Sequence, residues 1–562
     1  MTATPAAGDA GISGRLAAIP RSRLVVAALV LLSLLALFLL YIKGNDMTFY
    51  FDEWDFVLRR HRTTVGIFLE PHNEHFSLVP VIVYKILFAT AGLDHYAPYR
   101  IVALALHVTI AALVFVFARA RVGDVLALAA ATLMLFLGAG FEDVLWPFQI
   151  GFLFALAAGL GAFILLERET RAGDFFAMIL LGVSLASASL GIPVALGAGA
   201  YLLVSPVRRG RLWVVLVPLL LYAIWYLGYG KSALRGENVT AAPQYTADEV
   251  AGAVGGVVGL AVEWGRILAV VAVAGLALHM ARVRKLPRTL VMVLTAAISF
   301  WVLTALARAQ LQEATISRYV YAGGFFVILL AVEVVRGRRF SGRAIGVVAG
   351  VTVLAALSGM NMFKKGADGL RYTDRIVRAE ITPLEIGGTQ MPPFFVPDPQ
   401  KAPQIVAGAY LETIRDLGSS PAYSEEQLAA LDEGHRQLAD GVFVRGYGLA
   451  LVPGSARPAG PAPAAQPDSA VRIRRSGSCV TAQPAVPGTS ETVVLRVPLG
   501  GMSLSAPGAG VTLRRYAAGF TGAPALTGDA GAAVLRIPRD RSPRPWYAQV
   551  ANARSLRACG LG

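Results

Sequence analysis

The chain has few charged residues and few cysteines for its length. Charged side chains make up 15% of the 562 residues, and the two cysteines, Cys479 and Cys559, both lie in the last fifth of the sequence. Motifs of nucleotide phosphate loops, Cys-X-X-Cys redox pairs, His-Glu-X-X-His zinc proteases and Gly-X-Ser-X-Gly hydrolases are absent. The sequence therefore does not support nucleotide hydrolysis, thiol redox chemistry or the common protease and esterase mechanisms.

Apolar residues, in contrast, make up 55% of the chain and gather into long blocks as far as about residue 360. This pattern predicts a polytopic all-α membrane domain with about 11 to 13 transmembrane helices. The first block follows Arg21 and Arg23 and lacks a small-residue cleavage site, so we expect a retained span. The candidate spans are roughly residues 24–42, 77–92, 99–117, 124–140, 147–166, 174–190, 192–206, 212–229, 251–281, 289–307, 319–335 and 344–360.

The net charge is +15, and the densest basic groups lie in short loops between apolar blocks. The positive-inside rule predicts that these loops face the cytoplasm, and no recognition motif accompanies them, so we expect no nucleic-acid partner. Everything after residue 360 is then exported. Counting spans gives a conflict that requires one segment not to cross. The weakest candidates are 77–92 and the pair 174–206, which Gly191-Ile-Pro193 breaks and which could be one kinked helix or a tight hairpin. The basic loops contain Arg208, Arg209, Arg211, Arg282, Arg284, Lys285, Arg288, Arg336, Arg338, Arg339 and Arg343.

The composition after residue 360 is that of a soluble protein. We expect five regions: a cytoplasmic segment 1–23, a membrane domain 24–360, an exported helical segment 361–452, a Pro/Ala-rich linker 453–469 and a small β-sandwich 470–562. Ser424 followed by Gln427 predicts a capped helix start. An exported tail permits a disulfide between Cys479 and Cys559, the alternative being two unpaired thiols.

The strongest candidates for chemistry are Asp52, Glu53 and Asp55, which directly follow the first span. A carboxylate on an aromatic-rich loop at the membrane surface can accept the proton of an acceptor hydroxyl. An ordinary solvated acidic loop is the alternative.

A second polar group, His72, Glu74 and His75, precedes the second apolar block. With the acidic loop it could orient a phosphate or bind a divalent cation. Its spacing matches no fixed metal motif, so hydrogen bonding between the two histidines is the favoured interpretation. Whether a metal or any other cofactor is needed stays open.

Further candidates lie where spans begin or end. Glu142 and Asp143 should lie at an interface or in a wet cavity, because carboxylates are costly inside a bilayer. The alternative is that they are ordinary polar residues of a loop. Arg318, with Tyr319, could clamp a phosphate or could snorkel to the interface. Arg100 is a weaker candidate of the same kind, and His107 is expected to be packed and hydrogen bonded.

The order of these motifs resembles the N-terminal module of GT-C fold glycosyltransferases. The likeness covers roughly residues 20 to 330 and consists of Phe51-Asp-Glu-Trp-Asp, Pro71-His-Asn-Glu-His-Phe-Ser, Tyr99-Arg100 and Ser317-Arg318-Tyr319. The resemblance implies a polyprenyl-phosphate sugar donor, Asp52 or Glu53 as the catalytic base, and Arg318 near the donor phosphate. A β-domain after the last span is similar to that of arabinosyltransferases, whose tails bind carbohydrate, although their longer insertions are missing.

These observations predict an inverting glycosyltransferase in the cell membrane. It would move a sugar from a polyprenyl-phosphate carrier to an exported glycan, lipid or protein acceptor, with membrane lipids around it. Two alternatives belong to other classes. A transporter or flippase of lipid-linked glycans would favour charged pairs deep within the spans. A non-enzymatic envelope protein that presents the β-domain would not require the acidic loops.

Overall fold

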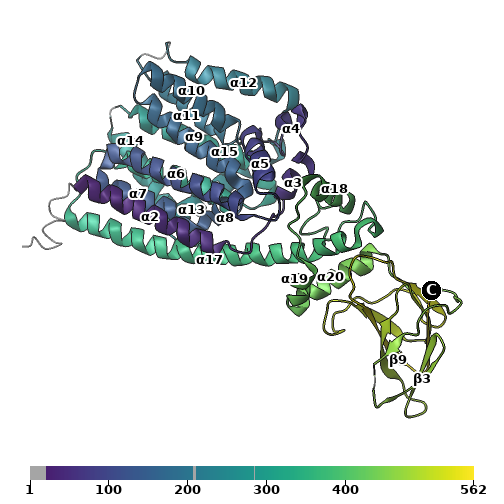
Figure 1. Ribbon diagram of the computed structural model, residues 1–562. Coiled ribbons are helices and arrows are strands. Elements are labelled where there is room, and N and C mark those ends of the chain that lie inside the picture. The colour runs from purple at the N-terminus through teal and green to yellow at the C-terminus, as the bar shows by residue number, and fades with distance from the viewer. Residues whose placement is uncertain (1–20, 207–209, 284, 467, 562) are drawn as a thin grey trace, which may run out of the picture. The chain divides into compact units, whose positions relative to one another are not determined.

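The computed structural model describes residues 21–206, 210–283, 285–466 and 468–561 (Figure 1). Most of the predicted segment 1–23, and the basic residues Arg208, Arg209 and Arg284, lie outside these residues. The chain divides into two compact units. We call residues up to Asp46, Arg62–Leu87 and Ala97–Gly369 the membrane unit, and Met47–His61, Phe88–Tyr96 and the residues from Leu370 onward the C-terminal unit.

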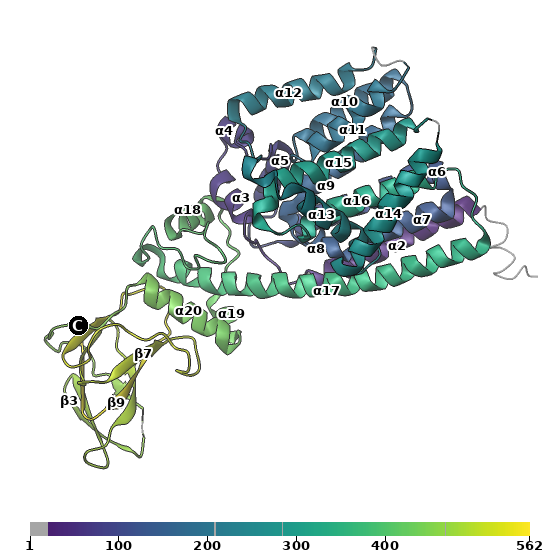
Figure 2. The same cartoon turned by 180° about the vertical axis from the view of Figure 1, so that it is seen from behind.

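The membrane unit is built from helices (Figure 2). Eight helices of the described chain are long and apolar enough to cross a membrane, and three shorter apolar helices accompany them. The predicted polytopic α-helical domain is therefore confirmed. Its helices are α2 (Arg21–Lys43), α4 (Val65–Leu69), α5 (Leu78–Thr90), α6 (Ala97–Val122), α7 (Asp124–Leu135), α8 (Phe141–Leu145), α9 (Ile150–Leu166), α10 (Arg171–Leu185), α11 (Gly191–Leu203), α12 (Trp213–Tyr229), α13 (Ala242–Val257), α14 (Val262–Arg282), α15 (Arg288–Arg308), α16 (Ser317–Val334) and α17 (Gly342–Gly387).

The expected single span 251–281 is wrong, because the chain turns between α13 and α14. Gly259 has φ +73°, a left-handed conformation that glycine adopts without a Cβ penalty. A Cβ there would also lie 2.8 Å from the Ser358 Cβ, so the close approach of α17 requires glycine. The segment around Gly191 forms two helices, α10 and α11, and not one kinked helix.

Buried polar groups join the helices of the membrane unit. His107 is completely buried; its Nδ1 lies 2.8 Å from the Tyr321 hydroxyl and its Nε2 lies 3.0 Å from the Leu135 carbonyl. The expectation of a packed, hydrogen-bonded histidine is confirmed. Arg121, near the end of α6, pairs with the buried Glu333, near the end of α16. These contacts satisfy polar groups that would otherwise be costly to bury.

The C-terminal unit combines short helices with a β-domain. Its helices are α3 (Glu53–Arg60), α18 (Ala407–Leu417), α19 (Glu425–Ala430) and α20 (Glu433–Gly446), and it also contains the last part of α17. The Ser424 hydroxyl accepts the Gln427 N–H, and the Gln427 side chain accepts the Ser424 N–H, so the predicted helix cap at Ser424 is confirmed as a capping box.

The β-domain consists of two antiparallel sheets, as the alternating sequence pattern predicts. The strand orders are β1-β8-β6-β10-β4-β3 and β2-β5-β9-β7. Two-residue strands within the Pro/Ala-rich segment pair with β8 and β5. The strands are β1 (Val452–Pro453), β2 (Ala464–Ala465), β3 (Val471–Ser476), β4 (Cys479–Pro484), β5 (Glu491–Val497), β6 (Gly501–Ser505), β7 (Gly510–Arg514), β8 (Ala533–Arg536), β9 (Trp546–Ala553) and β10 (Leu556–Gly560).

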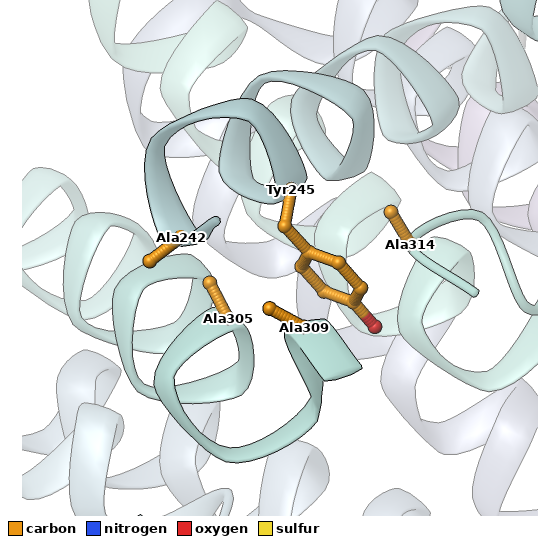
Figure 3. Packing of buried hydrophobic residues seen from close by; sticks show 5 residues of the cluster. All are labelled: Ala242, Tyr245, Ala305, Ala309 and Ala314. Atoms are coloured by element: carbon orange, nitrogen blue, oxygen red, sulfur yellow. The ribbon is translucent and has the colours of Figure 1, made fainter. Parts of the chain in front are cut away.

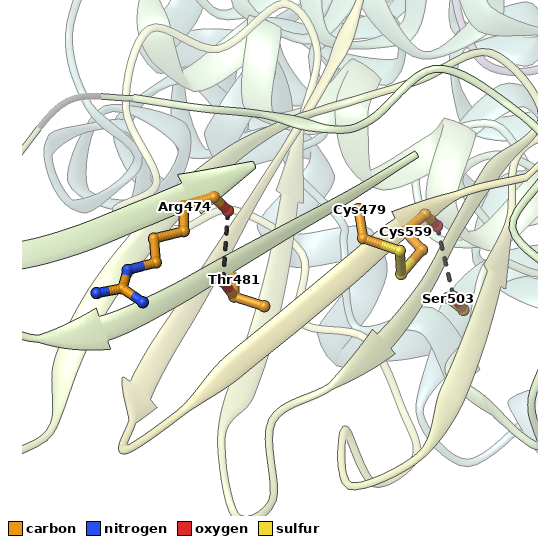
Figure 4. Close-up of a disulfide and its surroundings, with 5 residues drawn as sticks. All are labelled: Arg474, Cys479, Thr481, Ser503 and Cys559. Carbon is orange, nitrogen blue, oxygen red and sulfur yellow. Dashed lines mark hydrogen bonds between the residues drawn. A yellow bond between two sulfur atoms is a disulfide. The ribbon is translucent and has the colours of Figure 1, made fainter. Parts of the chain in front are cut away.

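The predicted disulfide between Cys479 and Cys559 is present. The two residues face each other in register on the neighbouring strands β4 and β10, with Cα atoms 4.0 Å apart (Figure 4). They are separated by 80 residues of sequence, so the bond restricts a long loop of the unfolded chain. In the chain-entropy model such a bond stabilises the fold by about 4 kcal/mol.

Two carboxylates of α20 fix it to the β-domain. Asp440 is completely buried and accepts the main-chain N–H groups of Arg515, Tyr516 and Ala517 at 2.9 to 3.0 Å. Glu433, two turns earlier, accepts the next two N–H groups, of Ala518 and Gly519, at 2.9 Å. Five consecutive N–H groups that follow β7 are thus satisfied by one helix, as buried main-chain donors require.

We expect Asp440→Ala to destabilise the β-domain by about 3 kcal/mol or more, because it leaves several buried N–H groups without an acceptor. Protease digestion of the purified full-length protein, followed over increasing urea concentration, measures this loss. Asp529→Ala, which changes an exposed loop acid of the same domain, is the control and should unfold like the parent. An unchanged midpoint for Asp440→Ala would show that the contact carries no stability.

Candidate functional site

Glu53 is the most tightly held residue of the acidic loop. It begins α3 and is completely buried. Its Oε2 accepts the Tyr96 hydroxyl at 2.8 Å and the Tyr50 N–H at 3.2 Å. Phe49 packs its ring against both Trp54 and Tyr96, with centroids 5.8 and 5.0 Å apart. The side chain of Glu53 is therefore fixed inside an aromatic shell of the C-terminal unit.

Asp52 and Asp55 are less buried than Glu53. Asp52 is partly exposed and lies immediately before α3, without a capping hydrogen bond from its side chain. Asp55 forms an ion pair with Arg59 one turn later, at 3.1 Å. Burial raises the pKa of the Asp55 carboxyl above its usual range, against the opposing effect of Arg59 and Arg60. Among the three acids, Asp52 combines partial exposure with a position at the helix start.

The residue before Asp52 has an unusual backbone conformation. Phe51 has φ 42°, which is uncommon for a bulky residue and costs energy. Asn73, between His72 and Glu74, has φ 53°, a value that asparagine tolerates better. Both polar loops thus contain a residue in the left-handed region. Such conformations occur where the surrounding structure holds a side chain in a required direction.

The second polar group forms a tight turn in the membrane unit. His72 and His75 exchange main-chain hydrogen bonds of 3.0 and 2.9 Å. The two residues are hydrogen bonded, as expected, although through their backbones. The ring of His75 faces Ser189, in the turn between α10 and α11, with 2.8 Å between Nδ1 and Oγ. Glu74 forms an ion pair with Arg308 at the end of α15.

The contacts of His75 determine its tautomer. The Ser189 N–H points at Nδ1 from 3.4 Å, which makes Nδ1 an acceptor and leaves the proton on Nε2, 3.9 Å from the Glu74 carboxylate. Burial, assisted by the positive charge of Arg318, lowers the pKa of His75 to about 4. The ring is therefore neutral at physiological pH.

The third group lies where α8 meets the start of α16. The Arg318 Nη1 lies 3.3 Å from the Glu142 Oε2, and the Ser317 hydroxyl accepts the Glu142 N–H at 3.0 Å. The Arg318 side chain is 28% exposed, and its guanidinium lies 5.5 Å from the Tyr319 ring centroid. Asp143 is completely buried, and neither of its carboxylate oxygens has a hydrogen-bond partner among the described residues.

A small cluster positions the segment that carries Arg308 and Arg318. The Tyr245 ring lies among alanines of α13, α15 and the following loop, as Figure 3 shows. The Tyr245 hydroxyl donates to the Glu313 carbonyl at 3.2 Å. The outer end of α15 and the start of α16 are thereby held together. The cluster consists of Ala242, Tyr245, Ala305, Ala309 and Ala314.

Arg100 has a contact that accounts for its burial. Its Nη2 donates to the carbonyls of Leu40 and Tyr41 at 3.2 and 2.6 Å. These carbonyls belong to the last turn of α2, where helical N–H donors run out; Leu40 also accepts the Gly44 N–H at 3.2 Å. We therefore assign Arg100 to capping α2.

The structure brings together Glu74 with His75, and Glu142 with Arg318, within the membrane unit. Asp52, Glu53 and Asp55 belong to the C-terminal unit. Among the described residues, no group of three or more His, Cys, Asp or Glu side chains is arranged to hold a metal ion. Sequence reasoning missed Tyr96, Ser189 and Arg308. The pairing of each depends on contacts across at least 40 residues of chain, which no local motif signals.

Comparison with known proteins gives one structural likeness. No family model matches the chain, and no curated protein matches it. The chain is similar to ArnT from Cupriavidus metallidurans bound to undecaprenyl phosphate, at 15% sequence identity and a TM-score of 0.44, over 73% of this chain and 89% of that chain.

We expect His75 to make the protein less stable in acid. Unfolding restores a pKa of about 6.5, so the unfolded chain takes up a proton that the folded chain refuses until about pH 4. Stability should fall as pH decreases from 6.5 towards 4, and His75→Asn should remove part of that fall. Thermal unfolding across this range measures it. His95→Asn is the control, because that side chain is 74% exposed; equal profiles for both variants would refute the assignment.

Proposed function

We propose that this protein is a membrane glycosyltransferase that moves a sugar from a polyprenyl-phosphate donor to an exported acceptor. The observation that carries the proposal is the pair of adjacent carboxylates directly after the first span. Glu53 is buried and locked by two donors, and Asp52 beside it is partly exposed and follows a strained residue. A fixed carboxylate at a membrane surface suits proton transfer next to a lipid carrier.

The proposal places the acidic loop and the C-terminal unit on the exported side. Tyr96, which follows α5, bonds to Glu53, which precedes it, and both residues lie in the C-terminal unit. The proposal therefore keeps α5 on one side, which would remove the conflict in counting spans. The proposal also keeps α13 on one side, starting from the contact of its first turns with the loop after α15.

Eleven helices of the described chain then cross the membrane. This odd number takes an inside N-terminus to an exported C-terminus and keeps every described basic loop in the cytoplasm. The disulfide supports the same orientation, since such bonds persist in oxidising compartments. The crossing helices are α2, α6, α7 with α8, α9, α10, α11, α12, α14, α15, α16 and α17.

The proposed reaction is a single displacement. The acceptor hydroxyl oxygen attacks the anomeric carbon, and its proton passes to the Asp52 carboxylate. The bond from the anomeric carbon to the phosphate oxygen breaks, and the polyprenyl phosphate leaves with the electron pair, which inverts the anomeric configuration. The family resemblance assigns Arg318 to the donor phosphate, and its guanidinium keeps its charge and offers several donors beyond the one that faces Glu142.

The distribution of ion pairs favours an enzyme over a transporter. Arg121 and Glu333 are each the last residue but one of α6 and α16, and Glu167 follows the last residue of α9. These charges therefore lie at the ends of spans and not at the bilayer midplane, where transporters bind their substrates. A pure scaffold role would not need the buried Glu53 or the strained Phe51.

We expect Asp52→Asn to reduce sugar transfer in membranes at least about 100-fold while leaving folded protein levels unchanged, since it removes the proton acceptor. Glu53→Gln should lower stability, because it weakens the contacts to Tyr50 and Tyr96. Measuring both sugar transfer from radiolabelled polyprenyl-phosphate sugars and thermal unfolding separates loss of transfer from loss of stability. Asp94→Asn, an exposed acid of the C-terminal unit, is the control; full transfer by Asp52→Asn would refute the role.

Labelling of single engineered cysteines in cells should show the proposed topology. A membrane-impermeant maleimide should react with Asp94→Cys and Glu237→Cys from outside, and with Gly210→Cys and Lys285→Cys only after permeabilisation. Asp94 is the most informative position, because a cysteine there would be protected from the reagent if α5 crossed the membrane. Protection of Asp94→Cys in intact cells would overturn the assignment of α5.

A further inference from the structure

The β-domain has an unusual charge composition. Residues 470–562 contain twelve arginines, no lysine and three acidic residues, a net charge of +9 out of +15 for the whole chain. Asp540, one of the three acids, is nearly fully buried in an ion pair with Arg515. The surface of the domain is therefore positive. The positive-inside rule does not explain it, since that rule concerns short loops next to spans.

Four of these arginines lie on one face of the six-stranded sheet. Arg474 on β3 lies opposite Thr481 on β4. Arg557 on β10 lies opposite Thr481 on one side and Ser505 of β6 on the other. Residues directly opposite each other in antiparallel strands lie on the same face, as do residues two apart. Arg472 joins them on β3, and Arg536 joins them through its pairing with Gly501 on β6. We call Arg472, Arg474, Arg536 and Arg557 the arginine face.

The arginine face is exposed and carries no negative side chain. All four arginines are exposed, and none forms an ion pair with an acid of the described chain. The side chains between them are hydroxyls, an amide, the Cys479–Cys559 disulfide and the buried Val534. Figure 4 shows Thr481 and Ser503 in this region beside the disulfide. The polar neighbours are Thr481, Gln483, Ser503 and Ser505.

We propose that the arginine face binds an anionic polysaccharide on the exported side. Strands lie about 4.8 Å apart, so Arg474 and Arg557, two strands apart, present guanidinium groups about 10 Å apart across a flat surface. A polymer with carboxylates or phosphates at regular intervals can meet several such groups at once. Guanidinium forks pair with either anion through two hydrogen bonds, and the hydroxyls and the amide can bond to sugar hydroxyls.

Other polyanions fit this face less well. The arginine face contains no aromatic side chain on which a nucleic-acid base could stack. Among the described residues, Val452 on the edge strand β1 is the one large apolar side chain that the strands of the six-stranded sheet expose, and a single valine offers too little apolar area for insertion into a bilayer. The disulfide favours an oxidising compartment, where anionic glycans are the abundant polymers and nucleic acids are not.

Binding of polygalacturonate to the purified full-length protein tests the proposal. The variant in which Arg472, Arg474, Arg536 and Arg557 are all changed to Gln should bind about tenfold or more weakly, since each loses a charge-assisted contact. The charge-matched control changes Arg475, Arg496, Arg539 and Arg554, which are exposed on other parts of the same domain. This control should bind within about twofold of the parent, because only the face contacts the polymer.

Three results would overturn the proposal. Equal weakening by both quadruple variants would mean that net charge, and not the face, attracts the polymer. Equal binding of uncharged dextran would remove the role of charge. Tighter binding of duplex DNA or of anionic phospholipid vesicles than of polygalacturonate would assign the face to another partner. A phosphate-bearing glycan in a parallel arm shows which anion is preferred, and a non-reducing gel confirms that each variant keeps its disulfide.

The proposal does not depend on the catalytic role of Asp52. Asp52→Asn should bind polygalacturonate like the parent, and the arginine-face variant should transfer sugar to a small uncharged acceptor at the parental rate. Loss of transfer in the face variant together with intact polymer binding would refute the inference while leaving the proposed function in place.

Discussion

The hydrogen bond from the Tyr96 hydroxyl to Glu53 constrains much of this structure. It joins two loops that lie on either side of α5 in the sequence, and it does so with a completely buried carboxylate. A carboxylate in that environment is stable only where donors surround it, and Tyr96 and the Tyr50 N–H supply them. The hydrogen bond therefore fixes the start of α3, and with it the backbone position of Asp52.

The same principle recurs at α20. Asp440 and Glu433 neutralise the polarity of five main-chain N–H groups after β7, and so attach the β-domain to the helices before it. In both places an acid acts as an acceptor for donors that have no secondary-structure partner. Some acidic residues of this chain are candidates for chemistry, and others have a structural role. Those with a structural role are buried and accept several hydrogen bonds.

The features that depend on local pattern were predictable from the sequence. The apolar blocks, the cap at Ser424 and the alternating strands each reflect a period or a spacing that the residues show directly. The break at Gly259 was missed because a single glycine in an apolar run does not reveal that α17 passes within contact of it. The sequence left open whether 77–92 crosses, since the contact between Tyr96 and Glu53 joins residues 43 positions apart.

The candidate site was predictable only in part. The acids and histidines stood out by type and position, but their partners did not. Ser189 and Arg308 come from helices far along the chain, and nothing in their own neighbourhoods distinguishes them from other polar residues. Arg100 illustrates the opposite case, because a residue that suggested phosphate binding in the sequence has the carbonyls of α2 as its partners.

The position of β10 has a consequence for how the β-domain assembles. This strand is the last of the ten along the chain, yet it lies inside the six-stranded sheet, between β6 and β4. Until β10 arrives, β3 and β4 remain a separate hairpin from β6 and β8. The sheet therefore cannot close progressively as the polypeptide is synthesised. Its two halves must stay soluble and unjoined until the final strand is available.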